Sequence, residues 1–151
     1  MHITDLYFRG YRTHPERLAL SGDGGDFTYR QTFALTNRIA RRLRDAGIVC
    51  MPTVGALKHA QKAIEMGANV ITIQGGEGGG HTGSVPTAVR LPQVVDAVKV
   101  PVVAAGGFYD GRGLVAALAF GAQGIAMGTR FLMTRDSGVP EVTLQRYLDV
   151  R

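Results

Sequence analysis

A histidine, His81, lies near the end of the most glycine-rich stretch of the chain, residues 74–83. Glycine lets a backbone approach a ligand closely and adopt dihedral angles that are closed to other residues. Histidine titrates near neutral pH, so His81 is a candidate general base toward a carbon acid activated by a nitro or carbonyl group. A structural or merely exposed histidine is the alternative. Glu77, in the same stretch, either orients the imidazole or faces solvent, and the sequence leaves both open.

Two further glycine-containing stretches, residues 104–107 and 127–130, each follow an apolar run. Their backbone N–H groups, with the Thr129 hydroxyl and the Arg130 charge, suit a phosphate group. The helix expected after Gly107 would add the positive end of its dipole. Tight turns between strands and helices are the alternative interpretation, but two such stretches beside the glycine-histidine stretch favour a phosphate site.

The elements that must position these residues follow residue 48. Apolar periodicity and glycine stops predict an alternation of short strands and helices. The strands are expected at 70–73, 100–105 and 124–127, with 53–56 a strand end or loop. The helices are expected at 57–66, 91–98 and 111–120, with Pro92 in the first turn of the second. Nearly continuous apolar strands between helices predict a parallel α/β sheet covered on both faces. Ligands bind at the carboxyl ends of such strands, so the three polar loops should converge.

Residues 1–48 have a different character, because every Lys or Arg position there is arginine. We expect a helix at 6–11, a hairpin with strands 18–20 and 27–29, and a helix at 29–46 whose apolar face bears Leu35, Ile39 and Leu43. Thr28 should cap that last helix and Gly47 should end it. Since no Ser/Pro/Gly linker separates the two compositions, the sequence predicts directly abutting domains, 1–48 and 49–151.

The composition narrows the class of protein. The chain has 151 residues, 45% hydrophobic content and a net charge of +5. These values are typical of a soluble globular protein. The arginines at 38–44 fit a solvated helix face, without the basic stripe that nucleic-acid binding requires. No apolar run suits a membrane span, no acidic, His or Cys cluster has metal-ligand spacing, and the lone Cys50 fits a reducing compartment, so we expect a cytoplasmic protein.

From about residue 50 to 151 the chain resembles the nitronate monooxygenase family, also called 2-nitropropane dioxygenase. Five stretches carry the resemblance: 51–54 (MPTV), 74–83 (QGGEGGGHTG), 91–98 (LPQVVDAV), 101–107 (PVVAAGG) and 127–131 (MGTRF). The resemblance implies a TIM barrel that holds FMN without a covalent link. It assigns His81 as the catalytic base and places Gln74 and Gly75 beside the flavin. It implies that the flavin phosphate is held by five residues: Gly106, Gly107, Met127, Gly128 and Thr129.

Residues 1–48 resemble instead the start of an adenylate-forming acyl-CoA synthetase. The stretches that carry this resemblance are 14–20 (HPERLAL), 27–29 (FTY) and 37–43 (NRIARRL). The nucleotide-binding loop and catalytic residues of that family occur later in its sequence and have no counterpart here. We therefore expect this segment to carry no ligase chemistry.

The expected fold is a partial TIM barrel preceded by a hairpin-plus-helix segment. A complete barrel takes about 250 residues, so the sheet should have open edges that favour self-association. The expected function is FMN-dependent oxidation of alkyl nitronates or related carbon acids with O2. The alternatives are an FMN-dependent enoyl-acyl-carrier reductase and an inactive fused or truncated fragment with residual FMN binding. The physiological substrate is left open.

Overall fold

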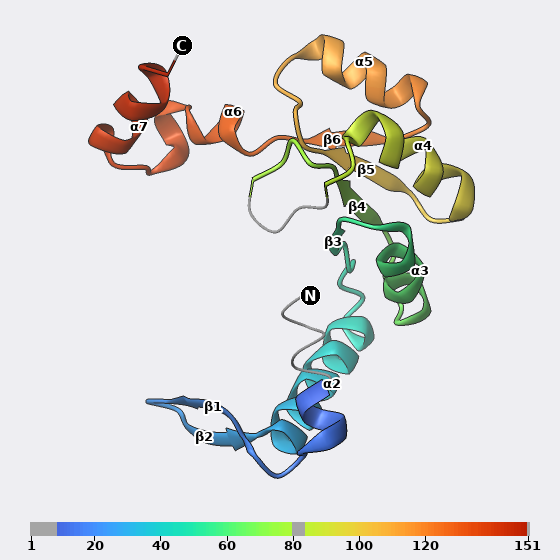
Figure 1. The fold of residues 1–151 in the computed structure, drawn as a ribbon, viewed down its shortest axis with the longest axis vertical. Coiled ribbons are helices and arrows are strands. Elements are labelled where there is room, and N and C mark those ends of the chain that lie inside the picture. The colour runs from blue at the N-terminus through green and yellow to red at the C-terminus, as the bar shows by residue number, and fades with distance from the viewer. Residues whose placement is uncertain (1–8, 80–83, 151) are drawn as a thin grey trace. The chain divides into compact units, whose positions relative to one another are not determined.

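The computed structural model describes residues 9–79 and 84–150. The chain divides into two compact units, Met1–Ile48 and Val49–Arg151, which are drawn in Figure 1.

The first unit contains a hairpin followed by a long helix. Strands β1 (Leu18–Gly22) and β2 (Gly25–Thr28) pair antiparallel. Helix α2 (Tyr29–Asp45) begins directly after them. The Thr28 side chain accepts the backbone N–H of Gln31, and the Gln31 side chain accepts the N–H of Thr28, which completes a capping box. The predicted cap is confirmed. The helix predicted at 6–11 lies mostly outside the described residues, and residues 9–13 are helical.

Little of the first unit is buried. In its described part, only Thr32 is fully buried on α2. The rings of Tyr11 and Phe33 stack with centroids 4.2 Å apart. The apolar stripe expected on α2 continues beyond these contacts, where Ile39 and Leu43 are 48% and 44% exposed. The helix is therefore defined more by its own caps than by a core.

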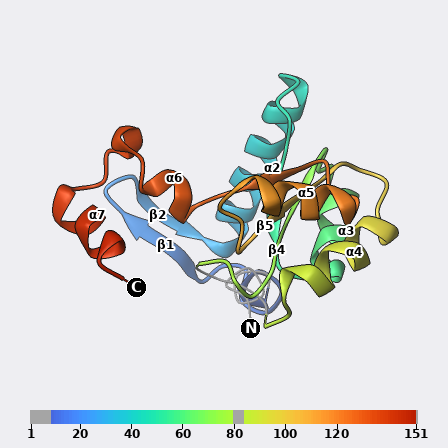
Figure 2. The same cartoon turned by 90° about the horizontal axis from the view of Figure 1, so that it is seen from above.

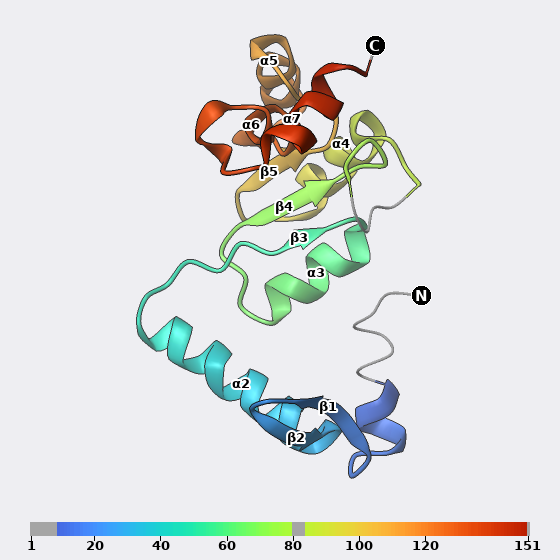
Figure 3. The same ribbon diagram turned by 90° about the vertical axis from the view of Figure 1, so that its left-hand side faces the viewer.

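The second unit is built on a four-stranded parallel sheet in the order β3-β4-β5-β6. Figure 3 shows β3, β4 and β5 side by side. The strand bounds are β3 Thr53–Val54, β4 Ile71–Gln74, β5 Val102–Ala105 and β6 Gly124–Ala126. Neighbours in the sheet follow one another along the chain, with a helix in each connection, as in successive units of a (β/α) barrel. The expected partial barrel is confirmed.

Helices pack against one face of this sheet (Figures 1 and 2). They are α3 (Leu57–Glu65), α4 (Thr87–Ala97) and α5 (Gly111–Ala119). Alternate strand residues such as Ile71, Ile73 and Ala104 join the buried cluster with Leu91 and Ala117 of the helices. These helices cover the side of the sheet that bears Ile71 and Ile73, and Thr72, on the other side of β4, is also only 4% exposed. Coverage of that second face along the whole sheet stays a prediction. This arrangement is that of a barrel wall, whose other face points inward in a closed barrel.

Helix α4 begins earlier than the sequence predicted. It begins at Thr87, four residues before the predicted start at Leu91, so Pro92 lies inside the helix instead of in its first turn. After β6 the chain forms α6 (Thr129–Leu132), the 3-10 helix η1 (Arg135–Ser137) and α7 (Glu141–Leu148). Within residues 9–79 and 84–150, every helix falls short of the length and apolar character that a membrane crossing needs.

Candidate active site

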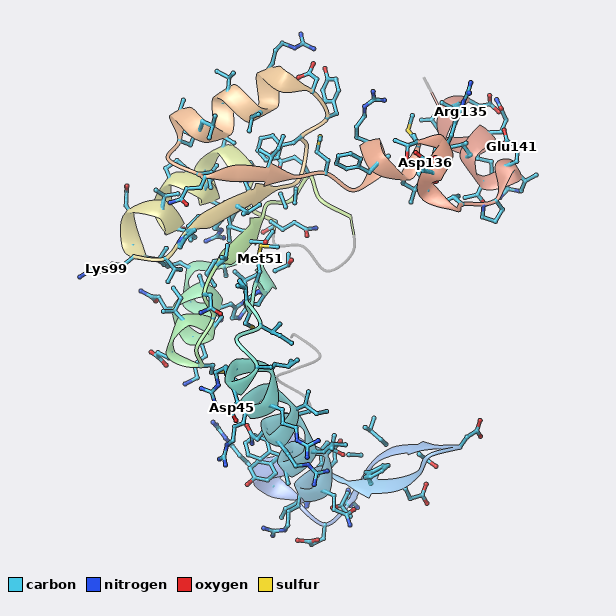
Figure 4. All side chains as sticks on the ribbon, turned by 180° about the vertical axis from the view of Figure 1, so that it is seen from behind. Asp45, Met51, Lys99, Arg135, Asp136 and Glu141 are labelled. Carbon is cyan, nitrogen blue, oxygen red and sulfur yellow. The ribbon has the colours of Figure 1, made fainter. Side chains whose placement is uncertain are left out.

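The loops after β4 and β5 meet at the carboxyl edge of the sheet. The N–H of Gly75 donates to the carbonyl of Ala105 over 3.2 Å. A Cβ atom built on Gly106 would lie 3.0 Å from the Gly78 nitrogen. Lys99, in the connection that leads into β5, belongs to the opposite edge (Figure 4). The sequence prediction that these two loops converge is confirmed by these contacts.

Gly106 and Gly107 turn the chain sharply after β5. Their φ angles are 98° and 77°, in the left-handed region that favours glycine. A Cβ on Gly106 would also come within 3.1 Å of Thr87 Oγ1, and one on Gly107 within 3.3 Å of Glu77 Cβ. Both positions therefore need glycine for conformation as well as for space.

Gln74 and Gly75 shape the start of the glycine-rich loop. The Gln74 side-chain amide donates to the carbonyl of Gly79 over 2.8 Å, which folds the side chain across the loop. A Cβ on Gly78 would collide with that amide, and a Cβ on Gly75 would collide with Thr87. In the part of the loop that the structure describes, Gly75 packs against Thr87 and Gly78 packs against the Gln74 side-chain amide.

Glu77 binds Thr87, a contact that neither of the two sequence alternatives contained. Glu77 Oε2 lies 2.7 Å from Thr87 Oγ1 and 2.9 Å from the Thr87 backbone nitrogen, and Oε1 lies 3.2 Å from the same nitrogen. Burial acts to raise the pKa of the Glu77 carboxyl. Hydrogen bonds from the Thr87 side chain and from the backbone of Glu77 and Thr87 outweigh it and lower this pKa below its ordinary value. Glu77 is therefore an ionised acceptor at neutral pH.

The loop after β6 is more open. Ala126 pairs with Ala105 in the sheet, so this loop leaves the same edge as the other two. Met127 is half-buried, whereas Gly128 and Thr129 are exposed. A Cβ on Gly128 would meet no atom within 4 Å, and no side chain caps the first turn of α6. The structure thus brings the loop that begins at Gln74 and Gly75 against the turn at Gly106 and Gly107, and leaves Gly128 and Thr129 accessible after the neighbouring strand.

The helix after Gly107 does not offer the free positive end that the sequence predicted. Asp110 caps α5, and its Oδ1 accepts the backbone N–H of Arg112 at 3.0 Å and that of Gly113 at 3.4 Å. Its Oδ2 accepts the Arg112 Nε–H at 2.9 Å. The Arg112 side chain is the main reason that the pKa of Asp110 lies below its ordinary value. That prediction was wrong, because a local carboxylate already occupies the N–H groups of α5.

His81 lies outside the described residues, as do residues 80, 82 and 83, so its predicted role as base stays a prediction. In the described ranges, no group of three His, Cys, Asp or Glu side chains is placed to hold a metal ion. Sequence reasoning missed Thr87 and Asp110. The aspartate before Gly111 is a standard cap signal. Thr87 gave no such signal, since its partner Glu77 lies ten residues earlier.

The family model of nitronate monooxygenase matches residues 23–151. This match begins inside the first unit, so the interpretation of residues 1–48 as a separate acyl-CoA-synthetase-like domain stays a prediction. One curated relative is the (3aS,4S,5R,7aS)-5-hydroxy-7a-methyl-1-oxo-octahydro-1H-indene-4-carboxyl-CoA dehydrogenase of Rhodococcus jostii strain RHA1. It is 57% identical over 119 residues, which cover 78% of this chain and 34% of the relative. The chain spans about a third of the length of the curated relatives it matches.

Two solved structures are similar to the chain. A mutant of FabK from Thermotoga maritima superposes with a TM-score of 0.70 and 38% identity, covering 74% of this chain and 38% of FabK. The nitroalkane oxidase of Streptomyces ansochromogenes superposes with a TM-score of 0.69 and 35% identity, covering 75% of this chain and 36% of the oxidase.

Proposed function

Because this chain belongs to the nitronate monooxygenase family, we propose that it carries the flavin-binding loops of an FMN-dependent oxidoreductase. The observation that carries the proposal is the contact between the turn at Gly106 and Gly107 and the loop that begins at Gly75. Two glycine loops in contact at the carboxyl edge of a parallel sheet form the usual position of a ligand in this architecture. The open loop after β6 borders the same edge.

The residues after β6 fit a flavin phosphate better than those of α5. Gly128 leaves its backbone uncovered, and Thr129 adds an exposed hydroxyl donor. Asp110, by contrast, places a carboxylate on the first turn of α5, where it would repel a phosphate. Since α6 has only four residues, its dipole adds little, and the donors themselves must hold the anion. We assign the phosphate to Gly128 and Thr129, with the backbone of Gly106, Gly107 and Met127 completing the cradle.

In this proposal Gln74 and Gly75 lie beside the flavin ring, and His81 removes a proton from the substrate carbon. His81 follows β4 by seven residues, in the connection to α4, which suits a group that reaches the same strand edge. When bound, FMN would supply the electron-accepting chemistry. The residues of the chain would bind and orient FMN and the substrate, and His81 would hold the proton.

Two substrate classes follow from the relatives. The family and the nitroalkane oxidase favour alkyl nitronates oxidised with O2. The 57% identity to a dehydrogenase of a CoA thioester favours a second candidate, a carbon acid activated by a thioester carbonyl. A nitroalkane, which is the protonated form of a nitronate, and a CoA thioester both present an acidic C–H beside an electron-withdrawing group, so the same histidine would serve either. The β3 and β6 edges of the described sheet lack a further strand, which supports completion of the barrel by another polypeptide segment.

A flavin titration tests the proposal. The purified chain is mixed with FMN or riboflavin, and binding is followed by visible absorbance and fluorescence quenching. We expect FMN to bind and riboflavin to bind more weakly, because only FMN carries the phosphate. His81→Asn should retain FMN and lose turnover of neutral nitroalkanes and CoA thioesters, each supplied separately. Failure of FMN to bind would favour the inactive-fragment alternative, and full turnover by His81→Asn would remove His81 as the base.

A further inference from the structure

One hydroxyl hydrogen at Thr87 has three acceptors within reach. Thr87 Oγ1 lies 2.7 Å from Glu77 Oε2, 3.2 Å from the Gly106 carbonyl oxygen and 3.3 Å from that of Ala105. A threonine hydroxyl donates one hydrogen, so it serves one acceptor at a time. The carboxylate is both the nearest acceptor and the ionised one, and therefore holds the hydrogen.

The same carboxylate replaces a helix cap. Thr87 is the first residue of α4, and the preceding Pro86 provides no capping side chain. Glu77 accepts the Thr87 N–H in its place. Thr87 is only 5% exposed, so removing its partner would leave a buried donor unsatisfied. Glu77 thus connects the glycine loop to the start of α4.

The Glu77–Thr87 pair also fills the space between the two glycine turns. Thr87 blocks any side chain at Gly75, and it lies 3.1 Å from the Cβ position of Gly106. The Glu77 Cβ lies 3.3 Å from the Cβ position of Gly107. We propose that Glu77 is a positioning residue, which ties residues 75–79 to the start of α4 and so holds the Thr87 side chain packed against Gly75 and the tip of β5. The role toward flavin rests on the function proposed above, because these are the backbone segments assigned to it.

Amide hydrogen exchange tests this tie directly. In Glu77→Ala we expect exchange at Gly75 and Gly78 to rise about tenfold or more, since one charge-assisted hydrogen bond is lost. The core amides of Ile71 and Ala104 should keep their rates. Glu65→Ala is the matched control, because Glu65 is an exposed carboxylate paired with Lys62 on α3. Faster exchange confined to the first turn of α4 would overturn the proposal. It would show that Glu77 caps α4 without holding the glycine loop in place.

The Thr87→Val variant tests the same proposal if Glu77→Ala fails to fold. Valine retains the backbone N–H that binds Glu77 but lacks the hydroxyl. We expect faster exchange at Gly75 and Gly78 with α4 preserved, while Thr87→Ser should behave as the unchanged chain. Equal protection of both glycines in Thr87→Val and Thr87→Ser would contradict the tie.

FMN binding provides the second readout. Glu77→Ala should weaken FMN binding about tenfold, and Glu65→Ala should leave it unchanged. If the unchanged chain binds no FMN, the proposed function fails, and the exchange data still decide whether Glu77 ties the loop. If FMN binds and Glu77→Ala has unchanged affinity, the positioning role is overturned although the flavin function stands.

Discussion

The turn after β5 and the turn after β6 begin alike, with a glycine at the tip of a parallel strand, but they end differently. Gly106 has a φ of 98° and neighbours at 3.0 and 3.1 Å from its Cβ position, and the helix that follows is capped by Asp110. Gly128 has a φ of −91°, no atom within 4 Å of its Cβ position and no side-chain cap after it. The first turn is a packed structural joint, whereas the second leaves its polar groups available.

The comparison teaches that glycine at a strand tip has two separate uses. At Gly106 it satisfies the conformation and packing of the protein itself. At Gly128 the protein makes no such demand, so a requirement for glycine there would come from a ligand. The following predictions test this division, starting with the largest expected effect.

Gly106→Val should destabilise the second unit most. The left-handed φ strains a branched side chain, and the backbone nitrogen of Gly78 cannot move away freely. We expect a loss of about 2 kcal/mol or more in the free energy of unfolding, measured by chemical denaturation. Gly128→Ala is the control and should change it by less than about 0.5 kcal/mol. Equal losses of unfolding free energy in the two variants would show that the two turns do not differ in their need for glycine.

Thr129→Val should weaken FMN binding about tenfold and leave riboflavin binding unchanged. The substitution conserves shape and removes only the hydroxyl proposed to bind the phosphate. Parallel fluorescence titrations with the two flavins measure the difference. An equal loss for both flavins would place Thr129 away from the phosphate.

Asp110→Ala should lower the melting temperature modestly, because α5 loses the acceptor for its first N–H groups. Asp110→Asn keeps a side-chain oxygen and should retain most of that stability. FMN affinity should not fall in either variant, since the proposed phosphate site lies after β6. A marked loss of FMN affinity in Asp110→Asn would indicate that the start of α5 belongs to the cofactor site.

Acid should loosen the joint after β5 before it affects the turn after β6. The pKa values of Glu77 and Asp110 are both lowered in the folded chain. Their stabilisation is therefore fully present above the ordinary carboxyl pKa of about 4, and is lost as the pH falls through the lowered folded values. Amide shifts of Thr87 and Gly113 should move in that range, whereas that of Thr129 should stay constant. A shift of Thr129 at the same pH would show that the two turns are coupled.

Much of the architecture was accessible from short-range patterns. The cap at Thr28, the alternation of strands and helices, and the loops at the tips of β4 and β5 were predicted correctly, because each depends on residues within a few positions. The start of α4 was missed because the carboxylate that caps it, Glu77, lies ten residues earlier in the same connection, outside the usual spacing of a cap. Pro92 suggested a first turn, but the helix begins four residues earlier, where Glu77 accepts the Thr87 N–H.

The apolar stripe of α2 shows what a short-range pattern cannot predict. Leu35, Ile39 and Leu43 follow helical spacing, and the helix forms with the predicted ends. Yet Ile39 and Leu43 are largely exposed, since periodicity reports which side of a helix is apolar and not what covers it.

Local chemistry accounts for the identity of the elements and for the order of the polar loops along the chain, because caps, glycine turns and apolar spacing act over a few residues. Long-range contacts decided the rest. They closed the turn at Gly106, bound Glu77 to Thr87 and left Gly128 open. The turn at Gly106 depends on how close strands β4 and β5 bring their backbones, and the Glu77–Thr87 contact on how the connection after β4 folds back onto the start of α4. Both geometries exist only once the sheet and its helices have formed.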